Sequence, residues 1–178
     1  MADNDMLNGV DVETFNATVN AVTDNPAQGA SSWKVTTKWN GGLKTEATIR
    51  DFSLNFDEPF PIGGQDSTIS PHETVLACYG ACLTVGISLN SALRGIEIRG
   101  LEVELEGFID LPGFLGLAEI GDLQDMPGFH TVKAKIRIES GASKEEIQSV
   151  YERAVKFSPV GLTLSQPVKL ENSLEHAS

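Results

Sequence analysis

The chain has 178 residues, of which 40% are apolar and 21% charged, and its formal net charge is -12 at pH 7. This length suits a single soluble domain with a substantial core, and the composition is that of an ordinary globular protein. The acidic excess excludes the basic footprint that nucleic-acid binding requires, and an anionic membrane surface would repel the chain for the same reason. We expect the acidity to serve solubility.

The N-terminal residues Met1–Asp5 lack the positive start and the apolar run of a secretory signal. The most apolar stretch, residues 74–93, is interrupted by glycines and serines, which favours a buried helix of a soluble protein over a membrane span. We therefore expect a cytoplasmic protein that does not enter a membrane. The end of the chain, about residues 173–178, contains Leu174-Glu175-His176, which resembles the start of an expression tag and is left out of the fold argument.

A helix is predicted from Asp11 to Thr23, because Asp11 can cap it and four apolar residues recur at helical spacing: Val12, Phe15, Val19 and Val22. Asn25-Pro26 ends it. The next feature is Asn40-Gly41-Gly42, which separates two strand-like runs at 33–39 and 43–50 and predicts a hairpin. A third strand follows, since three apolar residues alternate with polar ones: Phe52, Leu54 and Phe56.

A glycine- and proline-rich loop over 57–70 leads into a long helix, and such loops often carry functional sites. Ser70 can cap this helix, Pro71 suits its first turn, and Gly95 is its expected C-terminal stop after about Arg94. Apolar residues cover nearly every direction around the helix, so we expect it to be buried on all sides. In so small a chain, that places it in the middle of the fold or of a dimer.

Two further strands carry opposite charges. Leu101, Val103 and Leu105 alternate with glutamates, whereas residues 132–138 alternate apolar residues with Lys133, Lys135 and Arg137. Opposite charges stabilise facing strands by about 0.2–1 kcal/mol per pair, so we expect these two strands to pair antiparallel. Because Gly100 breaks the alternation, it predicts a bulge.

The connection over 108–129 is long and apolar, and it is either a functional arm or a short helix that packs on the sheet or on a partner chain. Ser143 and Glu146 form the pattern of a capping box, which predicts a helix that ends near Phe157. Residues 158–164 are expected to form a turn plus a short helical segment, and residues 167–171 a last strand.

The chemistry of the chain centres on two cysteines, Cys78 and Cys82, spaced four apart on the predicted long helix. Two cysteines make no disulfide framework, and their Cβ atoms point along the helix, which disfavours a disulfide between them. Gly80 and Ala81 permit close approach by another helix. A buried thiol in apolar surroundings is inert, and a reactive one needs a positive neighbour, so residue type alone favours a structural cysteine.

Other chemistries find little support. A zinc site needs four ligands, and only three histidines accompany the cysteines: His72, His130 and His176. They are also too few to suggest a histidine-based triad, and no serine lies in a nucleophile-elbow pattern. Gly63-Gly64 lacks the lysine and the spacing of a phosphate loop. We therefore expect neither a metal nor a cofactor.

Residues 64–83, a Gly-rich turn followed by Pro71, a glutamate, an apolar helix and Ala81-Cys82, resemble the core motif of the OsmC/Ohr family. Asp57-Glu58-Pro59 followed by Gly63-Gly64 resembles the OsmC-like branch, and Ser158-Pro159-Val160 falls where the family's second motif begins. The resemblance runs from about 33 to 172, so it implies a single domain over residues 1–178 with residues 11–24 as an N-terminal extension.

The resemblance implies an α+β fold, with antiparallel sheets around a long buried central helix, in an intertwined homodimer with sites at the subunit interface. It also implies thiol-dependent reduction of organic hydroperoxides and hydrogen peroxide, as in an oxidative stress response. In that chemistry one cysteine becomes a sulfenic acid, and a second cysteine then closes a disulfide. An arginine and a glutamate tune the first cysteine.

Carried over to this sequence, Cys82 matches the attacking cysteine, whereas Ser158 stands at the resolving position, where a hydroxyl cannot form a disulfide. The family's glutamate position holds His72, and Glu73 follows one residue later, a rotation of about 100° on a helix. Arg50 is the candidate activating arginine, and its alternative is a surface charge at a strand end. Cys78 as a resolving thiol would need local unwinding of the helix.

Two functions of different classes remain. The first is a one-cysteine peroxidase in which Cys82 attacks, Arg50 and Glu73 assist, and an external thiol completes the cycle. The second is a non-catalytic homodimer that binds a small apolar or thiol-containing ligand at the dimer interface, which Ser158 favours. A purely structural or interaction protein ranks last.

Overall fold

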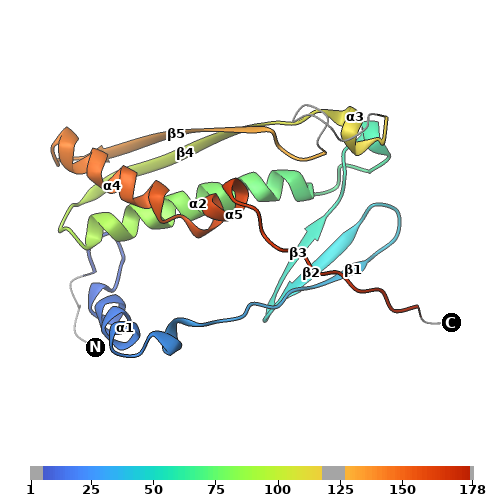
Figure 1. Cartoon of the computed structure of the whole chain (residues 1–178). Coiled ribbons are helices and arrows are strands. Elements are labelled where there is room, and N and C mark those ends of the chain that lie inside the picture. The colour runs from blue at the N-terminus through green and yellow to red at the C-terminus, as the bar shows by residue number, and fades with distance from the viewer. Residues whose placement is uncertain (1–5, 118–126, 177–178) are drawn as a thin grey trace.

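The computed structural model describes residues 6–117 and 127–176 (Figure 1). These residues form two antiparallel sheets and several helices, so the α+β class is confirmed. In chain order the elements are α1 (Val12–Asp24), the 3-10 helix η1 (Pro26–Gly29), β1 (Thr36–Trp39), β2 (Thr45–Ile49), β3 (Phe52–Phe56), the 3-10 helix η2 (Phe60–Ile62), α2 (Pro71–Ala92), β4 (Ile98–Phe108), α3 (Leu111–Phe114), β5 (Thr131–Ser140), α4 (Lys144–Lys156) and α5 (Pro159–Ser165).

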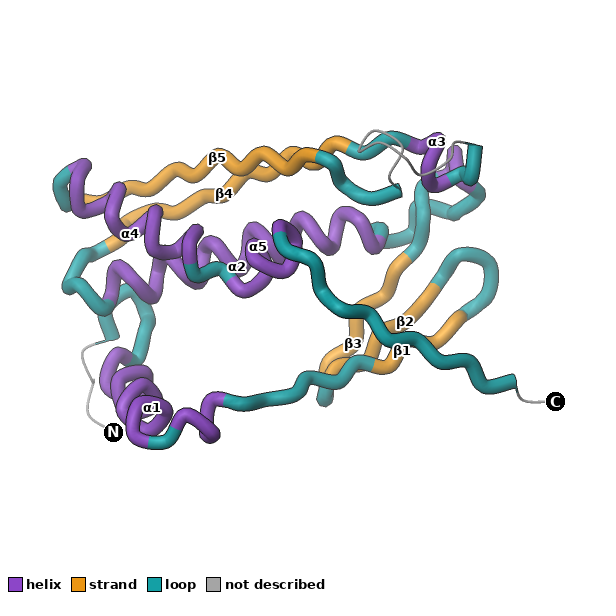
Figure 2. Tube along the Cα trace, in the orientation of Figure 1, coloured by secondary structure: helices purple, strands orange, loops and turns teal. Residues whose placement is uncertain are grey.

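The arrangement has two parts. In one, α2 lies along the long β4–β5 hairpin, and α4 and α5 pack beside it; in the other, the small β1–β2–β3 sheet projects away from this body (Figure 2). Helix α1 lies near the end of α2 (Figure 1). The predicted order of elements is confirmed in the described residues, except for the last strand at residues 167–171.

The small sheet has the predicted hairpin. Strand β1 pairs with β2 from Thr36 opposite Thr48 to Trp39 opposite Thr45, and β2 pairs with β3. Gly41 and Gly42 both have left-handed backbone angles, with φ of 91° and 58°, which a residue with a Cβ adopts only at a cost. The Asn40-Gly41-Gly42 pattern therefore predicted the turn correctly.

The paired charges of the long hairpin are confirmed. Glu102, Glu104 and Glu106 lie opposite Arg137, Lys135 and Lys133 in the register of β4 with β5. Arg137 Nη1 is 3.0 Å from Glu102 Oε2, but both side chains are about two-thirds exposed, so this ion pair fixes register more than it adds stability. The register shift lies between Ile98 and Gly100, where the bulge was predicted.

Helix α2 begins with a complete capping box. The Ser70 N–H donates to Glu73 Oε2 (2.7 Å) and the Glu73 N–H donates to Ser70 Oγ (3.3 Å), with Pro71 in the first turn. Gly95, at φ 71°, terminates the helical region as predicted. The Glu73 carboxylate thus accepts the Ser70 N–H. The spacing of three residues between Ser70 and Glu73 is the sequence pattern of a capping box.

One side of α2 forms the core. Leu83 and Ile87 are fully buried, and Ile87 clusters with Val150 and Ala154 of α4. A Cβ atom at Gly80 would lie 2.6 Å from Leu105 Cδ1. Within one chain, the close approach that Gly80 permits is therefore to strand β4, whereas Ala81 is exposed, so the approach of another helix there stays a prediction.

The other side of α2 is open. Val85 is 65% exposed, and Ala77, Cys78 and Ala81 are exposed as well. Within a single chain the helix is therefore not buried on all sides, because β4, α4 and α5 pack along one flank only. Its length and composition would also suit a membrane span, as they do for the core helix of many soluble proteins.

The predicted last strand is not present among the described residues, whereas a short helix is found in the apolar connection. Residues 167–171 form no strand, because they are exposed and have no neighbouring strand to pair with, and Pro167 lacks the N–H that a ladder needs. In the apolar connection the predicted short helix is α3, of four residues. Residues 118–126, which include Ile120 and Leu123, lie outside the described residues.

A buried carboxylate organises the loop before α2. Asp57 is 1% exposed and accepts hydrogen bonds from the Ser67 hydroxyl (2.7 Å) and from the backbone N–H groups of Ser67, Glu58 and Gln65. The Ser67 hydroxyl, together with these N–H groups, lowers the pKa of Asp57 from 3.8 to about 2. Gly64 is required here, since a Cβ atom would lie 1.7 Å from the Glu58 carbonyl oxygen.

The Asp57→Asn substitution should lower Tm at pH 7 by about 4 °C or more, because an amide NH2 would face donors that now meet a carboxylate. Because the folded-state pKa is depressed, the stabilisation is present above about pH 4 and is lost as pH falls toward 2. The difference in Tm between wild type and variant should therefore shrink over that interval. Scanning calorimetry from pH 2 to 7 measures it.

The matched control is Asp66→Asn, which removes the same charge from an exposed side chain of the same loop. Its Tm should stay within about 1 °C of the wild-type value. Equal effects of the two substitutions would contradict the role assigned to Asp57.

Candidate functional site

The structure brings together two of the residues singled out in the sequence. Cys82 lies in the middle of α2, and Ser158 lies 76 residues later, just before α5; the Cys82 Sγ is 3.2 Å from the Ser158 Oγ. Cys82 is partly buried and Ser158 is 2% exposed. A thiol and a hydroxyl from distant segments thus form one hydrogen-bonded pair at the edge of the core.

Local sequence explains why Ser158 lies there. Helix α4 ends at Phe157, Pro159 starts α5, and Ser158 is the N-cap whose Oγ accepts the Gly161 N–H (3.0 Å). A Cβ atom at Gly161 would lie 3.0 Å from both Ser158 Oγ and Tyr79 Cε2, so glycine lets α5 approach α2. When Cys82 is a thiolate, only the Ser158 hydroxyl can donate in the pair.

A groove of about 470 Å³ lies next to this pair: Gly161, whose N–H donates to Ser158 Oγ, is one of its lining residues, whereas Cys82 and Ser158 are not. Its walls come from α2, from the start of β5 with the residues before it, and from α5. They are formed by His72, Val75, Tyr79, Gly128, Phe129, His130, Thr131, Val132, Gly161, Leu164 and Ser165. The groove is thus largely apolar and aromatic, with a few polar groups, as small-molecule sites usually are.

Two side chains of α2 shape the groove. The His72 ring meets Phe129 edge-on, with ring centroids 5.6 Å apart. Burial raises the pKa of the Tyr79 phenol, and negative charge on Tyr151 and Cys82 raises it further. Tyr79 therefore stays protonated at neutral pH. Sequence reasoning missed Tyr79, although its position three residues before Cys82 puts both on about the same face of a helix.

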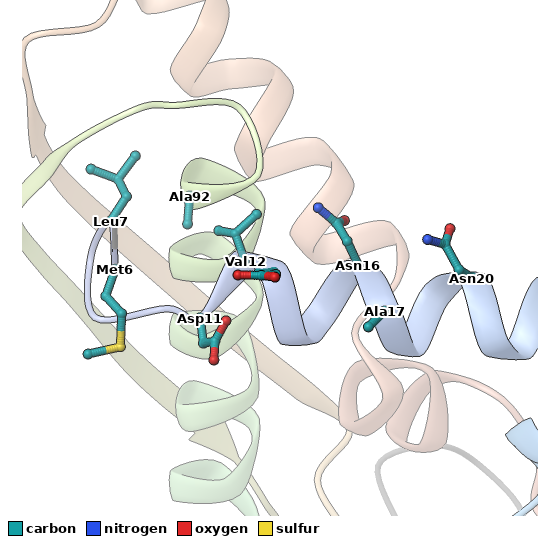
Figure 3. Close-up of a pocket in the computed structure, with 9 residues that line it drawn as sticks. Met6, Leu7, Asp11, Val12, Asn16, Ala17, Asn20 and Ala92 are labelled. Atoms are coloured by element: carbon teal, nitrogen blue, oxygen red, sulfur yellow. The ribbon is translucent and has the colours of Figure 1, made fainter. Parts of the chain in front are cut away.

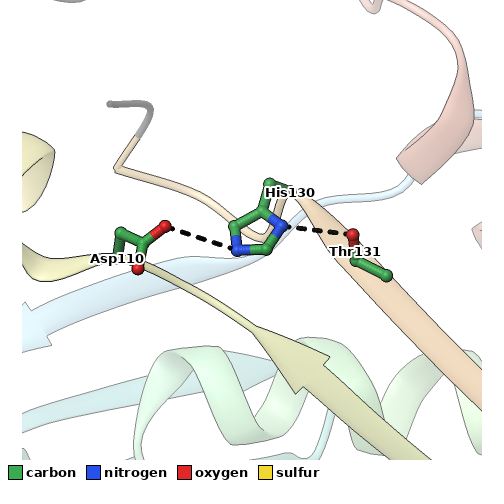
Figure 4. A network of polar contacts seen from close by, with 3 residues as sticks. All are labelled: Asp110, His130 and Thr131. Carbon is green, nitrogen blue, oxygen red and sulfur yellow. Dashed lines mark hydrogen bonds and ion pairs between the residues drawn. The ribbon is translucent and has the colours of Figure 1, made fainter. Parts of the chain in front are cut away.

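A polar network lies at the end of the β4–β5 hairpin where β4 ends and β5 begins (Figure 4). His130 Nε2 is 3.4 Å from Asp110 Oδ2, and His130 Nδ1 is 3.1 Å from Thr131 Oγ1. The network joins the end of β4 to the start of β5, and His130 and Thr131 also line the groove. The sequence singled out His130 only as a possible metal ligand, since Asp110 lies 20 residues away and no motif links the two.

The other predicted site residues lie elsewhere. The Glu73 carboxylate takes part in the capping box of α2. Arg50, in the turn between β2 and β3, places its guanidinium carbon 5.2 Å from the centroid of the Phe52 ring. Among the described residues, no hydrogen bond or ion pair joins Arg50 or Glu73 to Cys82. A single chain does not assemble the predicted cluster, so the roles of Arg50 and Glu73 stay predictions.

The secondary candidates differ in position. His72 lines the groove, whereas Cys78 is exposed on the open side of α2. Both cysteines are free thiols. Within residues 6–117 and 127–176, no group of three or more histidine, cysteine or acidic side chains lies close enough together to hold a metal ion.

A second groove, of about 680 Å³, lies between α1 and the end of α2 (Figure 3). Its walls carry Met6, Leu7, Asp11, Val12, Glu13, Asn16, Ala17, Asn20 and Ala92. None of these is a thiol or a histidine, so this groove does not offer the chemistry that Cys82 does. Of the two grooves, the one lined by Tyr79 and Gly161, next to the Cys82–Ser158 pair, is therefore the candidate site.

Comparison with known proteins adds the family context. A family model described as OsmC-like protein matches residues 64–173. Among curated proteins, none matches the chain. The matched residues include α2 with Cys82 and the Ser158 cap of α5.

Solved structures share the fold. An OsmC-like protein from Mycoplasma pneumoniae has a TM-score of 0.63 at 18% identity, covering 76% of this chain and 88% of that one. An organic hydroperoxide resistance protein OsmC from Legionella pneumophila has a TM-score of 0.56 at 17% identity, covering 76% and 91%. An organic hydroperoxide resistance protein from Elizabethkingia anophelis has a TM-score of 0.52 at 18% identity, covering 74% and 87%. At these identities the likeness establishes the fold alone.

The Ser158→Cys substitution tests the geometry of the thiol–hydroxyl pair. With 3.2 Å between Cys82 Sγ and Ser158 Oγ, a second sulfur at this position should form a disulfide with Cys82 after modest adjustment. One equivalent of hydroperoxide should give an intramolecular disulfide, which peptide mass spectrometry locates between positions 82 and 158.

The control is Ser165→Cys, which places a thiol on the same short helix at its far end. It should not close a disulfide with Cys82 under the same conditions. Failure of the Ser158→Cys protein to crosslink, with Cys82 accessible to alkylation, would contradict the described pairing of α2 with α5.

Proposed function

Because the chain belongs to the OsmC-like family, we propose that it is a thiol-dependent peroxidase in which Cys82 attacks organic hydroperoxides or hydrogen peroxide. The observation that carries this proposal is the contact between Cys82 Sγ and Ser158 Oγ. It supports the alignment suggested by the sequence, in which Cys82 is the attacking residue and position 158 the resolving one. A groove beside the pair offers room for a small substrate.

The first half of the cycle is a two-electron oxidation of sulfur. The Cys82 thiolate attacks the terminal oxygen of the hydroperoxide, the O–O bond breaks, and an alkoxide leaves with the electron pair and takes up a proton. The products are a Cys82 sulfenic acid and an alcohol. The Ser158 hydroxyl, as a donor to the thiolate, helps to hold the sulfur in place.

The second half needs an external thiol. Ser158 cannot form a disulfide, and Cys78 lies on the exposed side of the same helix. An outside thiol condenses with the sulfenic acid, releasing water, and a second thiol then reduces the mixed disulfide. A cytoplasmic setting belongs to this proposal, since reduced thiols are maintained there and both cysteines are free.

A homodimer is also part of the proposal. The open side of α2 and the β1–β3 sheet together expose large apolar side chains, among them Val85, Trp39, Phe52 and Leu54, each at least 41% exposed. A second chain that covered them would remove apolar surface from water. Within one chain, no described hydrogen bond or ion pair joins Arg50 or Glu73 to Cys82. In a dimer, the partner subunit's Arg50 and the partner subunit's Glu73 would approach this thiol instead.

A specific observation favours a second candidate function, the binding of a small apolar or thiol-containing ligand without turnover. Ser158 removes the resolving thiol, Glu73 is held in a helix cap, and the groove would still accept a ligand. In that case Cys82 would be a packing residue. Turnover separates the two functions.

Hydroperoxide consumption is the corresponding test. With cumene hydroperoxide and dithiothreitol, the wild-type protein should turn over, and Cys82→Ser should lose at least about 100-fold because a hydroxyl is a far weaker nucleophile at neutral pH. Cys78→Ser is the matched control and should keep most of the activity. The absence of turnover in all three proteins would reject the peroxidase and favour the binding protein.

The dimer has its own test. Light scattering should give about twice the chain mass for the wild type, and Val85→Glu should shift the population toward monomers, because a buried unpaired carboxylate is costly. Val155→Glu, on the exposed part of α4, is the control and should leave the mass unchanged. A wild-type protein that is monomeric at tens of micromolar would overturn the dimer.

A further inference from the structure

The reaction proposed for Cys82 releases an alkoxide, and the residues assigned so far do not include a donor of the proton that this alkoxide needs. When the O–O bond of an alkyl hydroperoxide breaks, the departing alkoxide is a strong base and needs a proton in the transition state. Cys82 itself is a thiolate at that moment and has none to give. The Ser158 hydroxyl already serves two contacts, since its oxygen accepts the Gly161 N–H and it lies against the Cys82 sulfur.

We propose that Tyr79 is the residue that protonates the leaving oxygen. Its side chain lines the groove beside Cys82, and it lies three residues before Cys82 on α2, on about the same face of the helix. The ring is placed close to the reacting pair: Tyr79 Cε2 and Ser158 Oγ both lie 3.0 Å from the position that a Cβ would take at Gly161.

The chemistry of the phenol fits this task. Burial raises the pKa of Tyr79, and negative charge on Tyr151 and Cys82 raises it further, so the phenol keeps its proton at neutral pH. As the alkoxide forms, the thiolate charge on Cys82 disappears because sulfur becomes a neutral sulfenic acid. The proton is then passed to the more basic alkoxide, and the phenolate regains a proton from water.

Other proton donors of the groove are less well placed. His130 is engaged with Asp110 and Thr131, and His72 packs edge-on against Phe129. Tyr79 Cε2, in contrast, lies against Gly161, whose N–H donates to the Ser158 Oγ that contacts Cys82. The inference rests on the proposed function, because it assigns a role within that reaction.

The test compares oxidants that differ in their leaving group. For tert-butyl hydroperoxide, which releases a strongly basic alkoxide, Tyr79→Phe should slow the oxidation of Cys82 by about 100-fold. For peracetic acid, which releases a weakly basic carboxylate, the loss should be less than about threefold. Stopped-flow mixing with mass spectrometry of the Cys82 peptide gives both rate constants. Alkylation of Cys82 by iodoacetamide, whose leaving group needs no proton, should proceed at the wild-type rate.

The matched control is Thr163→Val, which removes a hydroxyl from an exposed residue of α5 that does not line the groove. It should leave the ratio of the two oxidation rates unchanged. Equal losses with both oxidants, or no loss with tert-butyl hydroperoxide, would overturn the role of Tyr79. If Tyr79→Phe does not fold, the wild-type protein still gives an answer: with a proton donor in place, its oxidation rates should depend only weakly on leaving-group basicity, and a steep dependence would reject the donor.

The outcome also separates this inference from the proposed function. Wild-type Cys82 that is alkylated but resists both oxidants would reject the peroxidase and Tyr79 together. Wild-type oxidation that Tyr79→Phe matches with both oxidants would reject Tyr79 alone and leave the peroxidase standing.

Discussion

The constraint on which the structure depends is the apolar character of α2 around its whole circumference. A helix of this kind must be covered in every direction, and a single chain covers one flank with the β4–β5 hairpin, α4 and α5. Gly80 and Gly86 bring Leu105 and Ala154 into contact with that flank. The opposite flank, with Val85 at its centre, stays open, and the small β1–β3 sheet projects away from the body (Figure 1). The proposed homodimer is the arrangement that would satisfy this helix.

The same helix sets the chemistry. It begins at a position fixed by the buried Asp57 carboxylate and by the capping box of Ser70, so the residues further along it have a defined orientation. Cys82 meets Ser158 where α5 touches the covered flank, and Gly161 makes that approach possible. The thiol is therefore partly buried at the edge of the packed core, with a hydroxyl beside it. Access for a small oxidant together with shelter from bulk solvent is what a reactive thiol requires.

Local signals predicted most of the fold. Asn40-Gly41-Gly42 located the hairpin, and the charge alternation of β4 and β5 gave their pairing. The last strand was wrong because a strand needs a neighbour that local sequence does not reveal. At the site, the family motif pointed to Cys82 and to position 158, and the structure brings them together. Tyr79 and the Asp110–His130 pair were missed, since their contacts join segments whose proximity depends on tertiary packing. The predicted grouping of Arg50 and Glu73 with Cys82 is not formed within one chain, and no local pattern in the sequence places either side chain beside the thiol.

The central claim is that Cys82 is oxidised by a hydroperoxide to a sulfenic acid. The most direct measurement adds one equivalent of cumene hydroperoxide in the presence of dimedone, which traps sulfenic acids, and then maps the adduct by peptide mass spectrometry. The account predicts the adduct on Cys82, formed within seconds and in large excess over any on the exposed Cys78. An adduct confined to Cys78, or none on either cysteine while Cys82 remains open to alkylation, would contradict it.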